Sequence, residues 1–318
     1  VTGGAGYIGS HIVDLLCELD YNVFVLDNLA NGYKENINSR AKFVYGDIRS
    51  KVELDNFFSK HKIDSIVHMS ALKAPGESMI NSAIYSNNNI IGSINLITAA
   101  IKFKVKKFIF SSSAAVYGQP KYNPIDELHP TNPINYYGYT KLFIENYLSW
   151  SSLQGDINYI VLRYFNAVGY SKKKNLCKNK EKNPQNLLPI IMEVANGSRK
   201  ILKVFGNDYP TYDGTCIRDY INVVDLADAH LKALDYLDEG KSCCLNLSSG
   251  TGYSVLDVIK ISEIVTARKI IYSISKRRMG DPAILISTNE NARKKLKWNP
   301  ANSDLKEIIK SMWAHYKN

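Results

Sequence analysis

A glycine-rich turn at the start of the chain constrains the fold more than any other feature. Residues 3–9 read Gly-Gly-Ala-Gly-Tyr-Ile-Gly, a G-x-x-G-x-x-G pattern. Glycine is needed where a turn adopts backbone angles closed to other residues and where the main chain touches a pyrophosphate. A helix expected from about Ser10 would point its N-terminal amides at those phosphates. The turn therefore predicts a dinucleotide site built on Gly3, Gly6, Tyr7, Ile8 and Gly9.

An acidic residue follows this turn at the distance that such a unit requires. Asp27 ends the apolar run 22–26, eighteen residues after Gly9. A carboxylate there binds the adenosine ribose and repels a 2′-phosphate, so it favours NAD over NADP. Because Val1 and Thr2 run straight into the glycines, we also expect that part of the feeding strand, and any targeting segment, precedes this numbering.

Short β-branched runs alternate with helical patterns through the first half of the chain. Strands are expected at 22–26, 43–45, 65–68, 107–110 and 159–162, and helices at 11–19, 52–60, 85–102 and 137–153. This alternation implies parallel strands joined by right-handed crossovers. We predict an α/β fold, with a doubly wound parallel sheet of Rossmann type in a first domain and a smaller mixed α/β substrate lobe after it. The domains would span residues 1–166 and 167–318, and a strand and a helix near 220–250 would return to the first domain. In this second half, helical spacing is seen at 187–195 and 224–237. Strand-like runs are seen at 201–205 and 246–247.

A second motif predicts acid–base chemistry beside the dinucleotide. Tyr137 and Lys141 are four residues apart, so they project from one face of a helix. A tyrosine of pKa about 10 is a poor base at neutral pH, and a lysine ammonium together with the nicotinamide charge lowers that pKa. Ser113, after the strand 107–110, would orient the substrate oxygen at the edge where open α/β sheets bind ligands. Tyr136 and Tyr139 lie on other helix faces, which leaves Tyr137 as the predicted acid–base.

Composition excludes several function classes. Half of the formal charge of +10 comes from the lysine-rich stretch 172–182, which has no apolar period and is typical of a solvated loop, so we expect no nucleic-acid surface. The sequence contains no run of about 18 uncharged apolar residues, so we expect no membrane-spanning helix. Five cysteines without C-x-x-C spacing argue against a disulfide framework and a zinc site and favour a reducing, cytoplasmic location. We expect no bound metal.

Further short segments carry a resemblance that extends from Val1 to about Pro300. They are 2–11, 26–28, 46–49, 72–74, 111–118, 163–166, 205–211, 214–215, 218–220, 277–278 and 280–281. Together they are similar to the extended short-chain dehydrogenase/reductase family, and within it to enzymes that epimerise UDP-sugars at C4. The resemblance implies interconversion of UDP-glucose and UDP-galactose with tightly held NAD. Tyr137 would take the proton of the sugar 4-hydroxyl while hydride passes from C4 to NAD, and the 4-keto sugar would then turn and be reduced on its other face.

The resemblance also implies, by position, which residues meet each ligand. Those expected at NAD are Asn28, Asp47, Ile48, Lys73, Asn88, Tyr137, Lys141 and Phe165. Those expected at the UDP-sugar are Ser113, Tyr137, Asn166, Asn186, Leu187, Phe205, Arg218, Tyr220, Arg278, Asp281 and Leu285. Two guanidiniums can clamp a diphosphate, and a phenyl ring offers the uracil an apolar wall. A homodimer formed through the helices at 85–102 and 137–153 is implied as well.

Several alternatives remain open within this resemblance. Leu285 stands where the family gates the 2-substituent of the sugar: a large ring is typical of enzymes restricted to plain hexoses, and a very small residue of those that admit N-acetyl sugars. Leucine is intermediate and leans towards restriction, so UDP-N-acetylhexosamine and UDP-pentose 4-epimerases are the alternatives. A 4,6-dehydratase is disfavoured because Ala114 and Ala115 offer no carboxylate. Ser113, Tyr137 and Lys141 argue against a catalytically silent NAD-binding protein.

Overall fold

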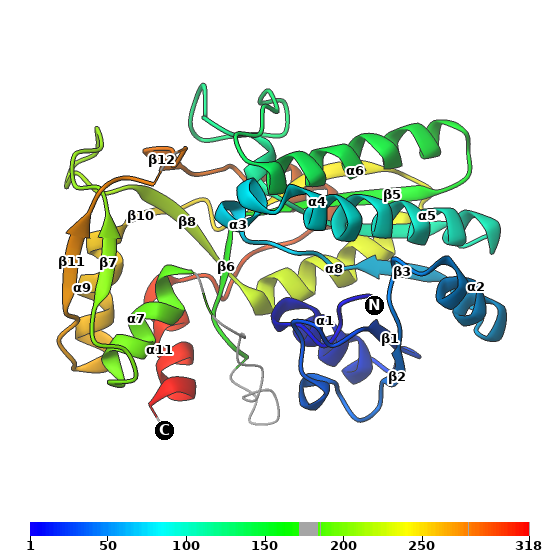
Figure 1. Ribbon diagram of the computed structural model, residues 1–318, viewed down its shortest axis with the longest axis horizontal. Coiled ribbons are helices and arrows are strands. Elements are labelled where there is room, and N and C mark those ends of the chain that lie inside the picture. Colours follow the sequence, from blue (N-terminus) through cyan, green and yellow to red (C-terminus); the bar gives the residue numbers. More distant parts are fainter. Residues whose placement is uncertain (172–183, 185, 279, 318) are drawn as a thin grey trace.

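The computed structural model describes residues 1–171, 184, 186–278 and 280–317, so the lysine-rich stretch 172–182 lies outside the described residues. The predicted α/β class is confirmed. A parallel sheet with helices on both faces forms the larger part of the molecule, and a smaller mixed α/β lobe stands at one end (Figure 1).

The glycine turn leaves from the middle of the main sheet. Strands β1 (Phe24–Asp27) and β2 (Lys42–Tyr45) pair in parallel, and so do β3 (Ser65–His68), β4 (Lys107–Ser113), β5 (Asn158–Tyr164) and β9 (Cys243–Leu247), in that order. Thr2 bridges Leu26 on one side and His68 on the other, both in parallel, and thereby joins the two groups of strands. Strands β1 and β2 lie on one side of Thr2, and β3, β4, β5 and β9 lie on the other. The strand order therefore reverses at Thr2, and doubly wound sheets bind ligands at such a switch point.

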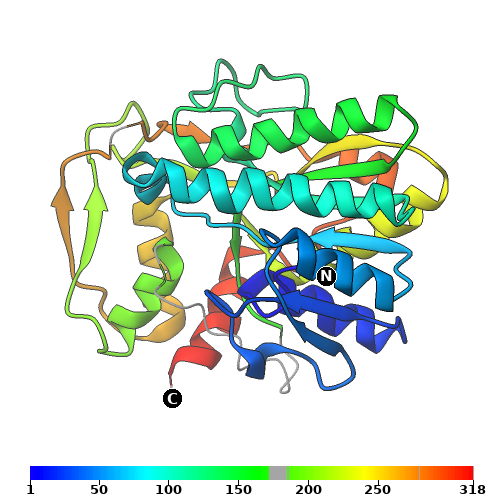
Figure 2. The ribbon, with the colours of Figure 1, turned by 45° about the vertical axis from the view of Figure 1, so that its right-hand side comes forward.

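Helices cover both faces of this sheet (Figure 2). One face carries α1 (Tyr7–Glu18), α8 (Val223–Asp238) and α10 (Glu290–Leu296), and the other carries α2 (Lys51–Lys60), α5 (Gly92–Lys102) and α6 (Tyr136–Leu153). The strands alternate between the two hydrophobic cores. On β4, Phe108 and Phe110 belong to the core under α2, α5 and α6, whereas Ile109 belongs to the core under α1 and α8. Because both faces are covered, the middle of a central strand is apolar on both sides, as Phe108, Ile109 and Phe110 show on β4.

Two predicted helices differ from those observed. Helix α1 begins at Tyr7 rather than near Ser10, so three residues of the glycine motif already belong to its first turn. The helix predicted at 85–102 consists of α4 (Ser82–Tyr85), a π-helical stretch η2 (Ser86–Ile91) and α5. Such π-helical turns are rare and occur often at functional sites. The short helix α3 (Pro75–Ile80), which precedes them, was not predicted.

The smaller lobe has its own core between three helices and a two-stranded sheet. Helices α7 (Leu187–Ala195), α9 (Val255–Thr266) and α11 (Leu305–Tyr316) pack together beside the parallel pair β7 (Leu202–Phe205) and β11 (Tyr272–Ser275). Strand β8 (Ile217–Asn222) lies at the junction of the two parts. It pairs with β6 (Asn166–Val168) and β12 (Ile284–Leu285) in parallel and with β10 (Gly252–Ser254) in antiparallel fashion.

Candidate active site

The glycine turn has no room for side chains. Gly3 has φ +69°, and a Cβ added there would lie 2.7 Å from the Ser70 nitrogen. A Cβ on Gly9 would lie 2.3 Å from the carbonyl oxygen of Gly3. Gly6 caps α1 without a side-chain hydrogen bond, so the first amides of the helix are not capped by any side chain. A cradle of bare backbone at an uncapped helix N-terminus fits a pyrophosphate.

Asp27 is fixed beside this cradle by two backbone amides. Its Oδ2 accepts a hydrogen bond from Ala5 N (3.0 Å) and its Oδ1 from Leu29 N (2.8 Å), and the side chain is buried. A carboxylate has about four acceptor positions, so both oxygens can accept further bonds from a ribose. Asp27 thus lies beside the glycine turn, held by the backbone of Ala5 and Leu29.

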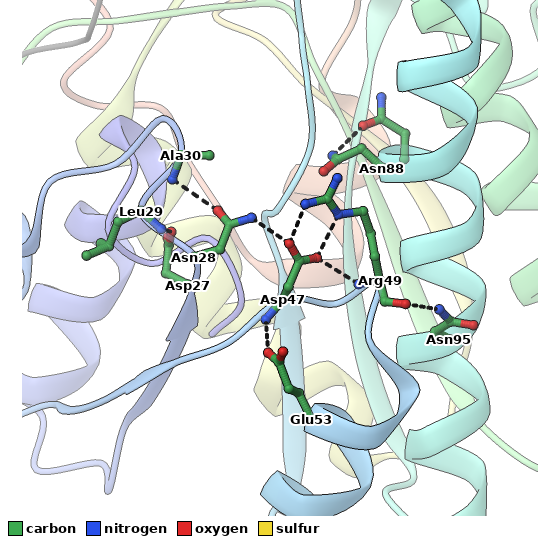
Figure 3. A network of polar contacts seen from close by, with 10 residues as sticks. Asp27, Asn28, Leu29, Ala30, Asp47, Arg49, Glu53, Asn88 and Asn95 are labelled. Carbon is green, nitrogen blue, oxygen red and sulfur yellow. Dashed lines mark hydrogen bonds and ion pairs between the residues drawn. The ribbon is translucent and has the colours of Figure 1, made fainter.

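Asn28 and Asp47 belong to a polar network next to Asp27 (Figure 3). Asn28 Nδ2 donates to Asp47 Oδ2 (2.9 Å), and Arg49 grips the same carboxylate through Nε (2.9 Å) and Nη2 (2.6 Å). These bonds, that of Arg49 foremost, lower the pKa of Asp47 to about 2. Asp47 is therefore anionic and holds Asn28 in place, a role that its sequence position did not predict.

A buried amide fixes the loop that carries Lys73. Asn89 accepts from Leu72 N (2.9 Å) and donates to Leu72 O (2.9 Å) and Thr140 Oγ1 (3.1 Å). The predicted ligand Asn88 is only half-buried and donates to Asn89 Oδ1 (3.0 Å). Asn89 was not predicted from the sequence, although it lies beside Asn88 in the π-helical stretch. Lys73 itself is exposed on this loop, and Ile48 is buried in the adjoining core.

Ser113, Tyr137 and Lys141 come together at the carboxyl end of β4. This strand continues three residues beyond the predicted run and ends at Ser113, after which the short 3-10 helix η3 (Ala114–Val116) begins. Helix α6 starts directly against η3, and a Cβ on Gly138 would lie only 2.4 Å from Ala115 O. This close approach brings Tyr137 over the end of the strand, where its backbone N donates to Ser78 Oγ (2.9 Å).

Lys141 is held under the tyrosine. Its Nζ donates to Ser111 O (2.6 Å) and lies 5.9 Å from the centre of the Tyr137 ring and 4.8 Å from that of Phe110. The pair predicted from the four-residue spacing therefore shares one buried face of α6.

The two pKa values follow from burial. Burial raises the pKa of Tyr137 to about 12, and a hydrogen bond with Ser113 opposes this rise. Burial lowers the pKa of Lys141 to about 7, and the Glu145 carboxylate opposes this fall. The hydrogen bond with Ser113 is thus a second contact, besides the predicted influence of the Lys141 ammonium, that favours the phenolate of Tyr137.

The residues expected at the UDP-sugar are drawn from separate segments around β8. Arg218 and Tyr220 lie on β8, and Leu285 of β12 is the register partner of Arg218. Asp281 Oδ1 is 3.6 Å from Arg218 Nη2, and the Arg278 guanidinium lies 4.1 Å from the centre of the Phe205 ring.

Asn166, Phe165 and Leu285 connect this group to the catalytic strand. Asn166 is the register partner of Tyr220 and donates to Asp219 O (2.8 Å). Phe165 is buried in a cluster with Ala114, and Leu285 packs against that cluster. Asn186 and Leu187 stand apart at the start of α7, where Asn186 is exposed.

The described part of the chain contains no group of three or more His, Cys, Asp or Glu side chains placed to hold a metal ion. None of its helices combines the length and the apolar character needed to cross a membrane. The cysteines at 17, 216, 243 and 244 are free thiols.

Known proteins of one family resemble the chain in both sequence and structure. A UDP-glucose 4-epimerase of Lacticaseibacillus casei is 43% identical over 320 residues, which cover 100% of this chain and 96% of the relative. A crystal structure of the Bifidobacterium longum UDP-glucose 4-epimerase with NAD+ and UDP superposes with a TM-score of 0.93 at 37% identity, over 99% of this chain and 96% of that one. The UDP-Glc/GlcNAc 4-epimerase of Campylobacter jejuni superposes with a TM-score of 0.86 at 38% identity, over 99% and 98%. The sequence pattern of the NAD dependent epimerase/dehydratase family matches residues 1–247. The chain belongs to the NAD dependent epimerase/dehydratase family.

Proposed function

We propose that the chain interconverts UDP-glucose and UDP-galactose by transient oxidation at C4 of the sugar, with NAD held throughout. The observation that carries this proposal is the assembly of Ser113, Tyr137 and Lys141 at the carboxyl end of β4, beside the glycine cradle. The Lacticaseibacillus relative, matched over 96% of its length, is named for this reaction. When bound, NAD supplies the acceptor and the donor of hydride.

The chain's own residues handle the proton and the orientation of the sugar. Ser113 hydrogen-bonds Tyr137 and would hold the sugar 4-oxygen between the two hydroxyls. Tyr137 takes the proton of the 4-hydroxyl as C4 is oxidised, and it returns that proton when the 4-keto group is reduced from the other face. Lys141, as ammonium, and the charge of the oxidised cofactor both favour the phenolate of Tyr137.

We further propose that the UDP part is held by the segments around β8. Arg218 and Arg278 would bind the diphosphate, because guanidiniums form paired hydrogen bonds with phosphate oxygens. Phe205, half-buried at the end of β7, would face the uracil. The remaining contacts are assigned to Asn166, Asn186, Leu187, Tyr220 and Asp281.

Leu285 carries the choice among sugars. It packs against the hydrophobic cluster that contains Phe165 and Ala114, at the end of β4, so a bulky substituent on C2 of the sugar would compete with it for space. We propose that plain hexoses are preferred and that UDP-N-acetylhexosamine is a poor substrate. Dual activity of the kind named for the Campylobacter relative is the alternative.

A homodimer and a cytoplasmic location complete the proposal. The helices at 82–102 and 136–153 lie side by side on one face of the sheet (Figure 1) and expose large apolar side chains: Ile84, Ile91, Tyr139, Trp150 and Leu153. A second copy of the chain would cover them. Light scattering at micromolar concentration tests this, and a monomer mass would contradict it. The free thiols at 17, 216, 243 and 244 suit a reducing compartment.

One experiment tests the activity. The purified protein is incubated with UDP-galactose, UDP-N-acetylgalactosamine, UDP-xylose or a dTDP-hexose, without added NAD, and the products are identified by NMR. Interconversion of UDP-galactose and UDP-glucose supports the proposal. Activity that depends on added NAD contradicts the retained cofactor, and turnover of none of the sugars contradicts the enzyme itself.

A further inference from the structure

A buried ion pair lies one helical turn beyond Lys141. Tyr137, Lys141 and Glu145 occupy successive turns of one face of α6, and all three side chains are buried. The Glu145 carboxylate accepts from Arg163 of β5 through Nε (3.0 Å) and Nη2 (2.5 Å). It also accepts from the Ser112 hydroxyl of β4. Glu145 therefore ties the catalytic helix to both strands that carry the site.

The ion pair continues into a chain of hydrogen bonds. Arg163 Nη1 donates to the Tyr117 hydroxyl (2.9 Å), and that hydroxyl donates to Asn246 Oδ1 on β9 (2.6 Å). Arg163 also lies 4.9 Å from the centre of the Tyr117 ring. A buried ion pair contributes little net stability, because the loss of hydration offsets most of the attraction. A contribution to stability is thus a weak explanation for burying the charges of Glu145 and Arg163.

The electrostatic surroundings of Lys141 give a stronger reason. Glu145 is the carboxylate whose charge supports the Lys141 ammonium. His68 of β3 also faces Lys141 but is neutral. Its pKa is lowered to about 3, mainly by burial and to a smaller extent by the charge of Lys141. Tyr137 is neutral as well, since burial raises its pKa to about 12. Arg163 is the cation that pairs with Glu145, at 2.5 Å between Nη2 and Oε2, and each of the two charges compensates the other.

The neutral groups packed against this part of α6 are two tyrosine hydroxyls and the Cys244 thiol of β9, whose pKa burial also raises. Burial raises the pKa of Tyr164 on β5 and that of Tyr85 on α4, so both hydroxyls stay protonated. Glu77 of α3 accepts a hydrogen bond from Tyr85 (3.0 Å).

We propose that Glu145, held by Arg163 and Ser112, is a positioning residue that keeps Lys141 charged and fixed beneath Tyr137 during the reaction. Glu145 acts through Lys141 and does not touch the sugar. The inference rests on the proposed function only where it concerns turnover, because the charge of Lys141 can be followed without any substrate.

Glu145→Gln is the primary test, since it removes the charge and keeps the shape. The alkaline limb of the kcat profile for UDP-galactose should move to lower pH by about one unit or more, the effect of one neighbouring carboxylate. KM should change little, because Glu145 does not contact the nucleotide. Tyr117→Phe is the matched control: it removes another partner of Arg163 but leaves the Glu145 charge, so its alkaline limb should stay in place. An unmoved profile in Glu145→Gln, with lowered thermal stability, would overturn the proposal and leave a structural ion pair.

A second measurement follows Lys141 directly in the purified, cofactor-containing protein. The pH titration of its Cε carbon is read by NMR in lysine-labelled protein and assigned through Lys141→Met. The midpoint should fall in Glu145→Gln relative to the parent, whether or not the protein turns over UDP-galactose. An unchanged midpoint would overturn the inference, while an inactive parent with a shifted midpoint would overturn the proposed function alone.

If Glu145→Gln does not fold, the double variant Glu145→Gln/Arg163→Met replaces the whole ion pair, a change that cores often tolerate. Both the alkaline limb and the Lys141 midpoint should then move in the same direction by a smaller amount, because a repelling cation is lost together with the carboxylate. A shift to higher pH would contradict the proposal.

Discussion

The two halves of the candidate site are built in different ways. On the proposed cofactor side, the glycine turn and Asp27 are fixed by backbone: Gly3 and Gly9 exclude side chains, and two amides hold the Asp27 carboxylate. On the substrate side, long side chains rest on one another. Arg278 lies over Phe205, and Arg218 is loosely paired with Asp281 at 3.6 Å.

The difference suits the roles proposed for the two halves. A retained cofactor is served best by a site that needs no rearrangement, because preorganised contacts lose little entropy on binding. A sugar that must turn within the site can do so if the protein binds mainly the UDP part of the substrate. We therefore expect substitutions on the cofactor side to change retention of NAD, and those on the substrate side to change KM.

The largest expected effect is on kcat, and it tests whether Tyr137 is the single acid–base group between the two halves of the site. Tyr137→Phe removes the hydroxyl that exchanges the proton, so kcat should fall by about 10³-fold or more. NAD content and thermal stability should match those of the parent, because the ring stays in place. Substantial residual turnover would show that another group carries the proton.

The next effect isolates the cofactor side. Asp27→Ala removes the ribose acceptor and should weaken retention of NAD by about 100-fold, the value of two hydrogen bonds to a charged group. Asp27→Asn, which keeps the size of the side chain, separates loss of charge from loss of the anchor for Ala5 and Leu29. Cofactor content after dialysis is the measurement, and undiminished content in both variants would contradict the assignment of Asp27.

A smaller effect isolates the substrate side. Arg278→Ala should raise KM for UDP-galactose by about 10-fold, because Arg218 remains to bind the diphosphate. Cofactor content should not change. Loss of NAD in this variant would break the comparison, since it would mean that the two halves are not independent.

The smallest effect concerns the sugar itself. Leu285→Ala opens space beside Phe165 and should raise kcat/KM for UDP-N-acetylgalactosamine relative to UDP-galactose by about 10-fold. Leu285→Tyr is the opposite change and should lower that ratio. Equal ratios in the parent and both variants would remove Leu285 from sugar selection.

The two halves also differ in how far sequence alone predicts them. The cofactor side uses local patterns: the glycine spacing, an acid at the end of the next strand, and a tyrosine and a lysine four apart on a helix. Each can be recognised within about twenty residues, and the fold class follows from the same alternation of strands and helices.

The substrate side uses contacts between distant segments. Strand β8 reads Ile-Arg-Asp-Tyr-Ile-Asn and has no apolar run to mark it, because its polar side chains serve the site and the junction. Arg218, Phe205 and Arg278 are far apart in the sequence and could be assigned only by resemblance. Glu145 was missed for another reason: its four-residue spacing from Lys141 is visible, but only the structure shows that Arg163 and Ser112 bury it.

Strand β9 has a consequence for how the protein is made. It completes the main sheet beside β5, yet it ends at Leu247, long after the other strands, and α10 covers it only after Leu296. While the ribosome is still adding these residues, the nascent first domain has an open sheet edge and an uncovered core. Such edges invite pairing with other chains. We therefore expect that the first domain cannot be expressed or exchanged as a unit that stops near residue 166, and that the nascent chain depends on chaperones until the sheet is closed.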